Sequence, residues 1–332
     1  MWKKISAIAI PIIIAVGILV FMLVSVSGDI GEAVKSVVPL WPLFLCAAVV
    51  LCACSWFVRG FRYKAILKRL GTHIKLPFST ASIYVSQTAN IIVPARLGDL
   101  VRMFILKHEK KTTYTSGFTS LVAERVYDII VIALLGLISL PFLFRLIPPQ
   151  YSWFTWLICG VLIAGALGII FLLLIRKAHA KNKIVAKVLE IFAQFREVSS
   201  SPKTFCVLVL TSAAAWMLDI IICWITALMF GCTVAFPIII LAVVIGNLVK
   251  AIPITPGGIG TYELAVAVVL GIGGVPAASA TLIAVIDHLI KNLVTIAGGI
   301  ISLIVFGDWS VSLMKRLFKE GKKSIKEEED GS

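Results

Sequence analysis

Long apolar runs separated by short polar segments follow one another along the whole chain. Six of these runs are long enough to cross about 30 Å of hydrocarbon as helices. The pattern therefore predicts an all-α polytopic membrane protein with about six full transmembrane helices. The runs are Ile5–Val26, Val38–Val58, Glu124–Phe144, Trp153–Ile175, Thr204–Phe230 and Pro276–Phe306.

Two further apolar segments, residues 77–106 and 237–274, are interrupted by polar and helix-breaking residues. Each is about long enough for two half-helices joined by irregular backbone. Such backbone is tolerated at membrane depth only where protein or a watery cavity surrounds it. We expect both segments to form re-entrant hairpins, with two short full spans as the alternative.

The two interruptions share the pattern P-x-x-[L/I]-G, at Pro94–Gly98 and at Pro256–Gly260. An acidic residue follows the proline at similar intervals, Glu124 after 30 positions and Asp287 after 31. Because three full spans precede the second unit, it would start from the opposite side of the membrane, as in inverted-repeat transporters. The sequence thus predicts a first repeat at residues 1–150, a second at 151–306 and a charged cytoplasmic tail at 307–332.

Composition excludes an ordinary soluble enzyme, since 60% of the residues are hydrophobic and only 14% are charged. The net charge of +14 would suggest nucleic acid in a soluble protein, but the positive-inside rule and anionic headgroups explain it here. We therefore expect no nucleic-acid partner. Residues 59–75 and 176–203 are expected to form basic loops on the cytoplasmic side, which predicts a multi-pass protein of the cell membrane with both termini cytoplasmic. The amphipathic stretch 181–198 is expected to lie on anionic headgroups at that face.

Charged side chains at membrane depth are costly, and they are functional candidates by default. Asp99 and Arg102 are i,i+3 neighbours, as are Arg125 and Asp128, and Asp287 and Lys291 are i,i+4 neighbours. Simple neutralisation of a buried helix would also produce such pairs. They cluster at the two interruptions. The first unit contributes Arg96, Asp99, Arg102, Glu124, Arg125 and Asp128, and the second contributes Asp219, Lys250, Glu263, Asp287, His288 and Lys291.

The glycine-rich break before Glu263 leaves backbone N–H groups free at the start of a half-helix, which favours an anion. Arginine forks suit a phosphate group in two-point contact. Together they predict a substrate-binding site for a phosphate-bearing headgroup, with Pro256, Gly257, Gly258 and Gly260 in its wall.

Glu263 itself has two interpretations. It would either cap the half-helix or carry a proton between the two faces of the membrane. A nearby cation, Lys250 or Lys291, would favour its charged form. Asp128, Asp219 and Asp287 are further candidate proton carriers.

Several motifs are absent from the sequence. It contains neither a Walker A sequence nor H-E-x-x-H, and its cysteines lie mostly inside apolar runs. We therefore expect no cofactor, no metal and no dedicated catalytic residue.

Three motifs occur in order: P-A-R-L-G-D-L-V-R at Pro94–Arg102, E-R-V-Y-D at Glu124–Asp128 and T-P-G-G-I-G-T-Y-E at Thr255–Glu263. With them the chain resembles, over nearly its whole length, the lysylphosphatidylglycerol synthase transmembrane family, also called flippase-like. The resemblance implies a stand-alone membrane unit without the synthase domain, which moves a lipid rather than transferring an aminoacyl group. Thr261 and Tyr262 stand where related members usually have an arginine or similar group, a difference that bears on headgroup preference.

The leading hypothesis is a flippase for a phospholipid, an aminoacyl-phospholipid or a lipid-linked substrate. One alternative is an integral-membrane transferase that acts on a lipid-linked substrate with Glu263 or Asp128 as base. Another is an accessory subunit of a lipid-synthesis complex. Membrane lipids are the expected partners, together with a separate lipid-synthesis enzyme.

Overall fold

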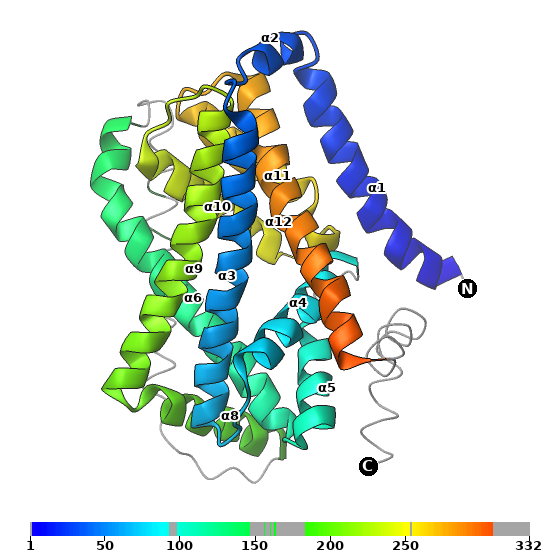
Figure 1. Ribbon diagram of the computed structural model, residues 1–332, viewed down its shortest axis with the longest axis vertical. Coiled ribbons are helices and arrows are strands. Elements are labelled where there is room, and N and C mark those ends of the chain that lie inside the picture. Colours follow the sequence, from blue (N-terminus) through cyan, green and yellow to red (C-terminus); the bar gives the residue numbers. More distant parts are fainter. Residues whose placement is uncertain are drawn as a thin grey trace.

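The computed structural model describes residues 2–92, 98–146, 183–252 and 254–307, together with Trp156, Gly160 and Ile163 (Figure 1). Every regular element in these ranges is helical. The helices are α1 (Trp2–Ser25), α2 (Ile30–Lys35), α3 (Trp41–Arg69), α4 (Leu76–Ile92), α5 (Gly98–Lys110), α6 (Tyr114–Leu146), α8 (Lys183–Ser199), α9 (Pro202–Met229), α10 (Phe236–Ala251), the short 3-10 turn η3 (Pro256–Gly258), α11 (Thr261–Ile272) and α12 (Ala277–Phe306).

Three of the described helices, α3, α9 and α12, are long and apolar enough to cross a membrane. Large apolar side chains such as Leu43, Leu210 and Ile304 remain exposed on their outer faces, as lipid-facing positions require. The predicted all-α polytopic membrane fold is confirmed. The predicted span 153–175 and the tail beyond residue 307 lie almost entirely outside the described residues.

Both interrupted segments consist of two short helices, α4 with α5 and α10 with α11. These helices have 12 to 17 residues, so each is about 18–26 Å long and too short to cross the hydrocarbon alone. In Figure 1 the α4–α5 pair enters from the lower end of the bundle and the α10–α11 pair from the upper end. Each pair therefore has the geometry of a hairpin that returns to the end from which it came.

The tips of the two hairpins meet in the middle of the molecule. Gly257 of η3 has φ +62°, and a Cβ atom there would lie 3.2 Å from the Cα atom of Ile91 at the end of α4. Only glycine combines this left-handed backbone with so close an approach. The contact places the tip of the second hairpin against the end of α4, although the two segments are far apart in the sequence.

The helix order is long, short, short, long in α3–α6 and again in α9–α12, which we term the first and second helix sets. The two sets begin at opposite ends of the bundle (Figure 1). The division into repeats at 1–150 and 151–306 remains a prediction.

One expectation about the loops was wrong. Residues 59–75 were expected to form a basic loop, but α3 continues through Arg69. Arg62 is buried there because Asp128 of α6 neutralises it, as described below. Counting charges along the sequence does not identify such ion-pair partners on other helices.

Helix α8 lies across the lower end of the bundle (Figure 1). Phe195 and Val198 on its apolar face are buried against Tyr127 of α6 and Leu208 of α9. This part of the amphipathic face packs on protein, where the sequence led us to expect lipid.

Candidate functional site

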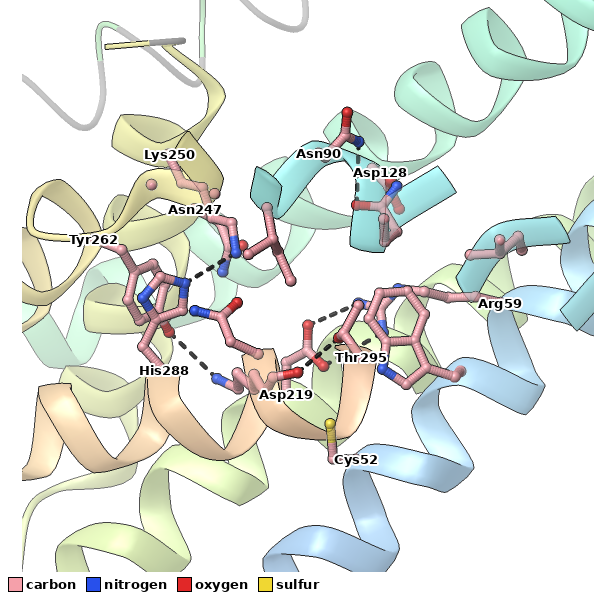
Figure 2. Close-up of a pocket in the computed structure, with 18 of the residues that line it drawn as sticks. Cys52, Arg59, Asn90, Asp128, Asp219, Asn247, Lys250, Tyr262, His288 and Thr295 are labelled. Atoms are coloured by element: carbon pink, nitrogen blue, oxygen red, sulfur yellow. Dashed lines mark hydrogen bonds and ion pairs between the residues drawn. The ribbon is translucent and has the colours of Figure 1, made fainter. Parts of the chain in front are cut away.

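A polar cavity of about 150 Å³ lies where the hairpin tips meet α3, α6, α9 and α12. One water needs about 10–15 Å³, so the cavity has room for on the order of ten waters. Figure 2 shows Lys250, Tyr262 and His288 on one side of it and Arg59 and Asp128 on the other, with Asp219 between them. Its other polar residues include Gln87, Asn90, Asn247, Asn292 and Thr295.

Two arginine–carboxylate pairs hold the first helix set together. Arg102 of α5 donates from both terminal nitrogens to Glu124 of α6, at 3.0 and 2.7 Å, and its side chain is only 2% exposed. Its guanidinium also stacks over Tyr63 of α3 at 4.3 Å. Arg62 of α3 donates to Asp128 of α6 at 2.5 Å. Removing one member of such a buried pair costs about 3–5 kcal/mol, so these contacts fix the cavity wall.

A third pair joins the two helix sets. Arg59 of α3 donates to Asp219 of α9 at 2.7 Å, and Ser55 also donates to Asp219 at 3.1 Å. Trp216 of α9 donates its indole N–H to Asp128 at 3.1 Å. α3 and α9 are thereby coupled by polar contacts at membrane depth.

Arg125 differs from the other arginines of the cavity. Its side chain is 44% exposed, and its carboxylate partners Asp99 and Asp128 lie 3.5 and 3.7 Å away. Asp99 is also held by the Asn90 amide at 3.0 Å. Arg125 is therefore the guanidinium that can turn to a new anion at the lowest cost.

In the second helix set, Glu263 is fixed by two contacts. One carboxylate oxygen accepts the backbone N–H of Gly260 at 2.7 Å, so the side chain caps its own helix α11. The other lies 2.7 Å from Nδ1 of His288, and the two side chains are only 6% and 1% exposed. Gly260 has φ +84°, and a Cβ there would be 2.8 Å from the carbonyl oxygen of Ala15 in α1.

His288 is the middle of a three-residue chain. Its Nε2 lies 3.1 Å from Nζ of Lys250. Because an ammonium group has no acceptor, a charged Lys250 donates to Nε2, and Nδ1–H then donates to Glu263. The imidazole ring also lies against Tyr262, with 4.4 Å between ring centres.

Beside this chain, Asp287 receives two donors. The Tyr262 hydroxyl donates to it at 2.8 Å and the Lys291 ammonium at 2.8 Å. Asp287 is fully buried, so these contacts are what make its charge tolerable.

The charges around the described cavity balance. Six cationic side chains line it, and six carboxylates contact those cations or His288. The cations are Arg59, Arg62, Arg102, Arg125, Lys250 and Lys291, and the carboxylates are Asp99, Glu124, Asp128, Asp219, Glu263 and Asp287.

Four buried polar atoms of residues that line the cavity have no hydrogen-bond partner within the described ranges: Nε1 of Trp56, Nε of Arg62, Oδ1 of Asn90 and Nε of Arg102. Buried polar atoms are normally paired, so a ligand or water is expected to meet them.

The sequence profile of the lysylphosphatidylglycerol synthase TM region matches residues 8–299. The chain belongs to this family. The match contains the whole described cavity and both hairpins.

Among relatives of the family unit, the glycosyltransferase AglD of Haloferax volcanii is 31% identical over 86% of this chain, and the chain spans 53% of AglD's length. A UPF0104 membrane protein of Methanocaldococcus jannaschii is 25% identical over 70% of this chain and 97% of its own. Another from Methanothermobacter thermautotrophicus is 23% identical over 89% and 92%. No solved structure gives a significant match to the chain.

The structure gathers most of the residues that the sequence singled out in this family unit. Arg102, Glu124, Arg125, Asp128 and Lys291 line the cavity, as do Gly257 and Gly258 of the second break. Asp99, Glu263 and Asp287 contact residues that line it. Pro256 starts η3 and Gly260 precedes α11. Arg96 lies outside the described residues.

Two details of the expected pairing differ. Arg102 uses both terminal nitrogens on Glu124 rather than on its i−3 neighbour Asp99. Glu263 contacts His288, where a lysine was expected. The expected pairs of Arg125 with Asp128 and Asp287 with Lys291 are present.

Arg59, Arg62, Trp56 and Trp216 belong to the cavity but were absent from the predicted site. From the sequence, these residues could have been assigned to the site only by their positions on α3 and α9. That assignment requires knowing that α3 continues past Arg59.

Proposed function

We propose that this protein moves a phosphate-bearing lipid across the membrane, with the headgroup passing through the central cavity. The observation that carries the proposal is Arg125, a half-exposed guanidinium with long ion-pair contacts beside a polar cavity at membrane depth. Placing a charged side chain at membrane depth costs free energy, so such residues usually have a functional role. A phosphate would give Arg125 two-point contact.

The surroundings of the cavity suit the rest of a lipid. Ile91 lines the cavity, and its neighbour Ile92 and the residues Ile252 and Ile254 at the other hairpin tip are exposed. Acyl chains can stay in hydrocarbon beside these side chains while the headgroup occupies the polar space. The substrate class then includes phospholipids, aminoacyl-phospholipids and lipid-linked phosphates.

The fold suggests how access would alternate. We propose that the repeats at residues 1–150 and 151–306 rock against one another, so that the cavity opens first beside one hairpin and then beside the other. The lower end in Figure 1 carries Lys68, Arg69 and Lys75, and by the positive-inside rule we assign it to the cytoplasm, with both termini. The Arg59–Asp219 pair between α3 and α9 would be remade in each cycle.

A second candidate is a transferase that acts on a lipid-linked substrate, which the similarity to the glycosyltransferase AglD favours. Its base would be Asp128 or Glu263. Asp128 is bonded to Arg62 and Trp216, and Glu263 to His288 and the Gly260 amide, so either carboxylate would have to exchange partners first.

Reconstitution separates the two candidates. Purified protein is placed in phosphatidylcholine vesicles with fluorescent phosphatidylglycerol, lysyl-phosphatidylglycerol or a polyprenyl-phosphate sugar, and transbilayer movement is followed by quenching from outside. A transporter accelerates the movement of one of these lipids and returns it chemically unchanged on chromatography. A new product without accelerated movement would replace the transport proposal with the transferase.

A further inference from the structure

Up to the breaks, the two helix sets place residues in matching positions at a constant interval. Gly71 and Gly231, 160 positions apart, both have positive φ (+76° and +68°) just after α3 and α9. The next helices carry proline as their second residue, Pro77 in α4 and Pro237 in α10. The same interval relates cavity residues Trp56 to Trp216, Arg59 to Asp219, Gln87 to Asn247 and Asn90 to Lys250.

Past the breaks the interval becomes 163 and relates α6 to α12. Glu124 then corresponds to Asp287, and Asp128 to Lys291. By this correspondence, His288 is the counterpart of Arg125 in the second helix set, and both residues line the cavity. A guanidinium in the first set is thus matched by an imidazole in the second.

This difference matters because of protonation. The cations that line the cavity from the first set, Arg59, Arg62, Arg102 and Arg125, are arginines and keep their charge in proteins. The second set instead contributes Lys250, His288 and Lys291 to the cavity lining, beside Tyr262, Glu263 and Asp287. Among the described basic groups of the cavity, those whose protonation can change in response to a ligand therefore lie in the second set.

From these observations, and resting on the proposed function, we propose that His288 takes up a proton together with the lipid phosphate, so that the protein carries both. Six cations line the described cavity, and six carboxylates line it or contact its lining residues, so a phosphodiester brings one uncompensated negative charge to membrane depth. One proton on His288 restores the balance.

The step is a simple protonation. The phosphate draws the Lys250 ammonium toward itself, which exposes the Nε2 lone pair of His288 that Lys250 occupied at 3.1 Å. A hydronium ion that reaches the cavity from solution gives its proton to that lone pair, so one O–H bond breaks, one N–H bond forms, and a water molecule and an imidazolium remain. Its Nδ1–H remains on Glu263 at 2.7 Å, and its new Nε2–H faces the phosphate. No other bond forms or breaks, and the lipid and proton leave together.

Among the described residues, the titratable and charged groups that face His288 divide into cations, which oppose its protonation, and carboxylates, which favour it. They are Lys250 of α10, Tyr262 and Glu263 of α11, and Asp287 and Lys291 of α12 itself, with Asp219 of α9 and Arg59 of α3 across the cavity. Asp219 is held by Arg59, and Asp287 by Tyr262 and Lys291. Glu263 is the carboxylate in direct contact with the imidazole, which makes it the counter-ion of the protonated ring.

The test counts protons. Purified protein in detergent is titrated with dihexanoyl-phosphatidylglycerol by calorimetry in two buffers of different ionisation enthalpy, and also with chainless glycerophosphoglycerol to distinguish a lipid from a free phosphodiester. We expect uptake of about one proton per bound ligand and a Kd that rises about tenfold per pH unit above neutrality, since the phosphodiester does not titrate there.

Variants locate the proton. His288→Asn should bind the probe without proton uptake and with a flat pH profile, whereas the matched control His108→Asn, at an exposed site on α5, should behave as wild type. Should His288→Asn fail to fold, the wild-type proton count still decides. Binding by wild type without proton uptake overturns the proton proposal alone. Absence of binding by every lipid of the reconstitution panel overturns the proposed function and the proton proposal with it.

Discussion

Arg59 and Asp219 form a 2.7 Å ion pair between positions that match one another in the two helix sets, 160 residues apart on α3 and α9. An arginine and an aspartate at equivalent places attract one another where two identical charges would repel. The contact joins the two sets beside the cavity.

Exchange of the two residues tests this equivalence. Asp219→Asn should destabilise the folded protein by about 3–5 kcal/mol, because Arg59 is left without its carboxylate in a largely buried place. The double exchange Arg59→Asp with Asp219→Arg should recover most of that loss. Thermal unfolding in detergent measures both, and a double variant no more stable than Asp219→Asn would contradict equivalent surroundings.

The hairpin tips give a second prediction. Gly257→Ala should destabilise by about 1–2 kcal/mol, since alanine is strained at positive φ and its Cβ would press on Ile91. Gly271→Ala is the matched control, because its helical backbone and open surroundings accept a methyl group. That control should be neutral or stabilising by up to about 1 kcal/mol. Equal unfolding temperatures for the two variants would show that the tips do not depend on this glycine.

The ion pair of Arg102 and Glu124 gives a third prediction. Glu124→Gln should cost about 3–5 kcal/mol, whereas Arg102→Met combined with Glu124→Leu should restore stability, as apolar replacement of a buried pair often does. If Arg102 acts chiefly by joining α5 to α6, the restored double variant still transports lipid. Loss of transport in a stable double variant would instead assign Arg102 to the phosphate.

Apolar run length was enough to place α9 and α12 to within a few residues, because a membrane span leaves a long uninterrupted signal. The hairpins could be predicted since proline and glycine break such runs. The full length of α3 could not be predicted, because the carboxylates that pair with Arg59 and Arg62 lie 160 and 66 residues away in the sequence. Charge along the chain therefore suggested a loop where there is a helix.

The candidate site shows the same limit. The acidic and basic residues near the breaks could be listed from sequence, and most of them line the cavity or contact residues that do. Their contact partners could not be predicted from the sequence, because the three-residue chain from Lys250 through His288 to Glu263 joins three helices. Pairing of this kind is a property of packing.

Arg125 carries the central claim, that the cavity accepts a lipid phosphate. The most direct measurement compares two fluorescent lipids in the same vesicles, phosphatidylglycerol and a glycosyl-diacylglycerol without phosphate, with wild type, Arg125→Gln and the control Arg69→Gln. Arg69 is exposed at the end of α3, where it bonds Thr204 outside the cavity.

We predict that wild type and Arg69→Gln accelerate only the phosphate-bearing lipid, and that Arg125→Gln lowers this rate roughly tenfold while unfolding at the same temperature, because a charge-assisted hydrogen bond to the phosphate is lost. Equal acceleration of both lipids, or an unchanged rate in Arg125→Gln, would contradict a phosphate-binding cavity.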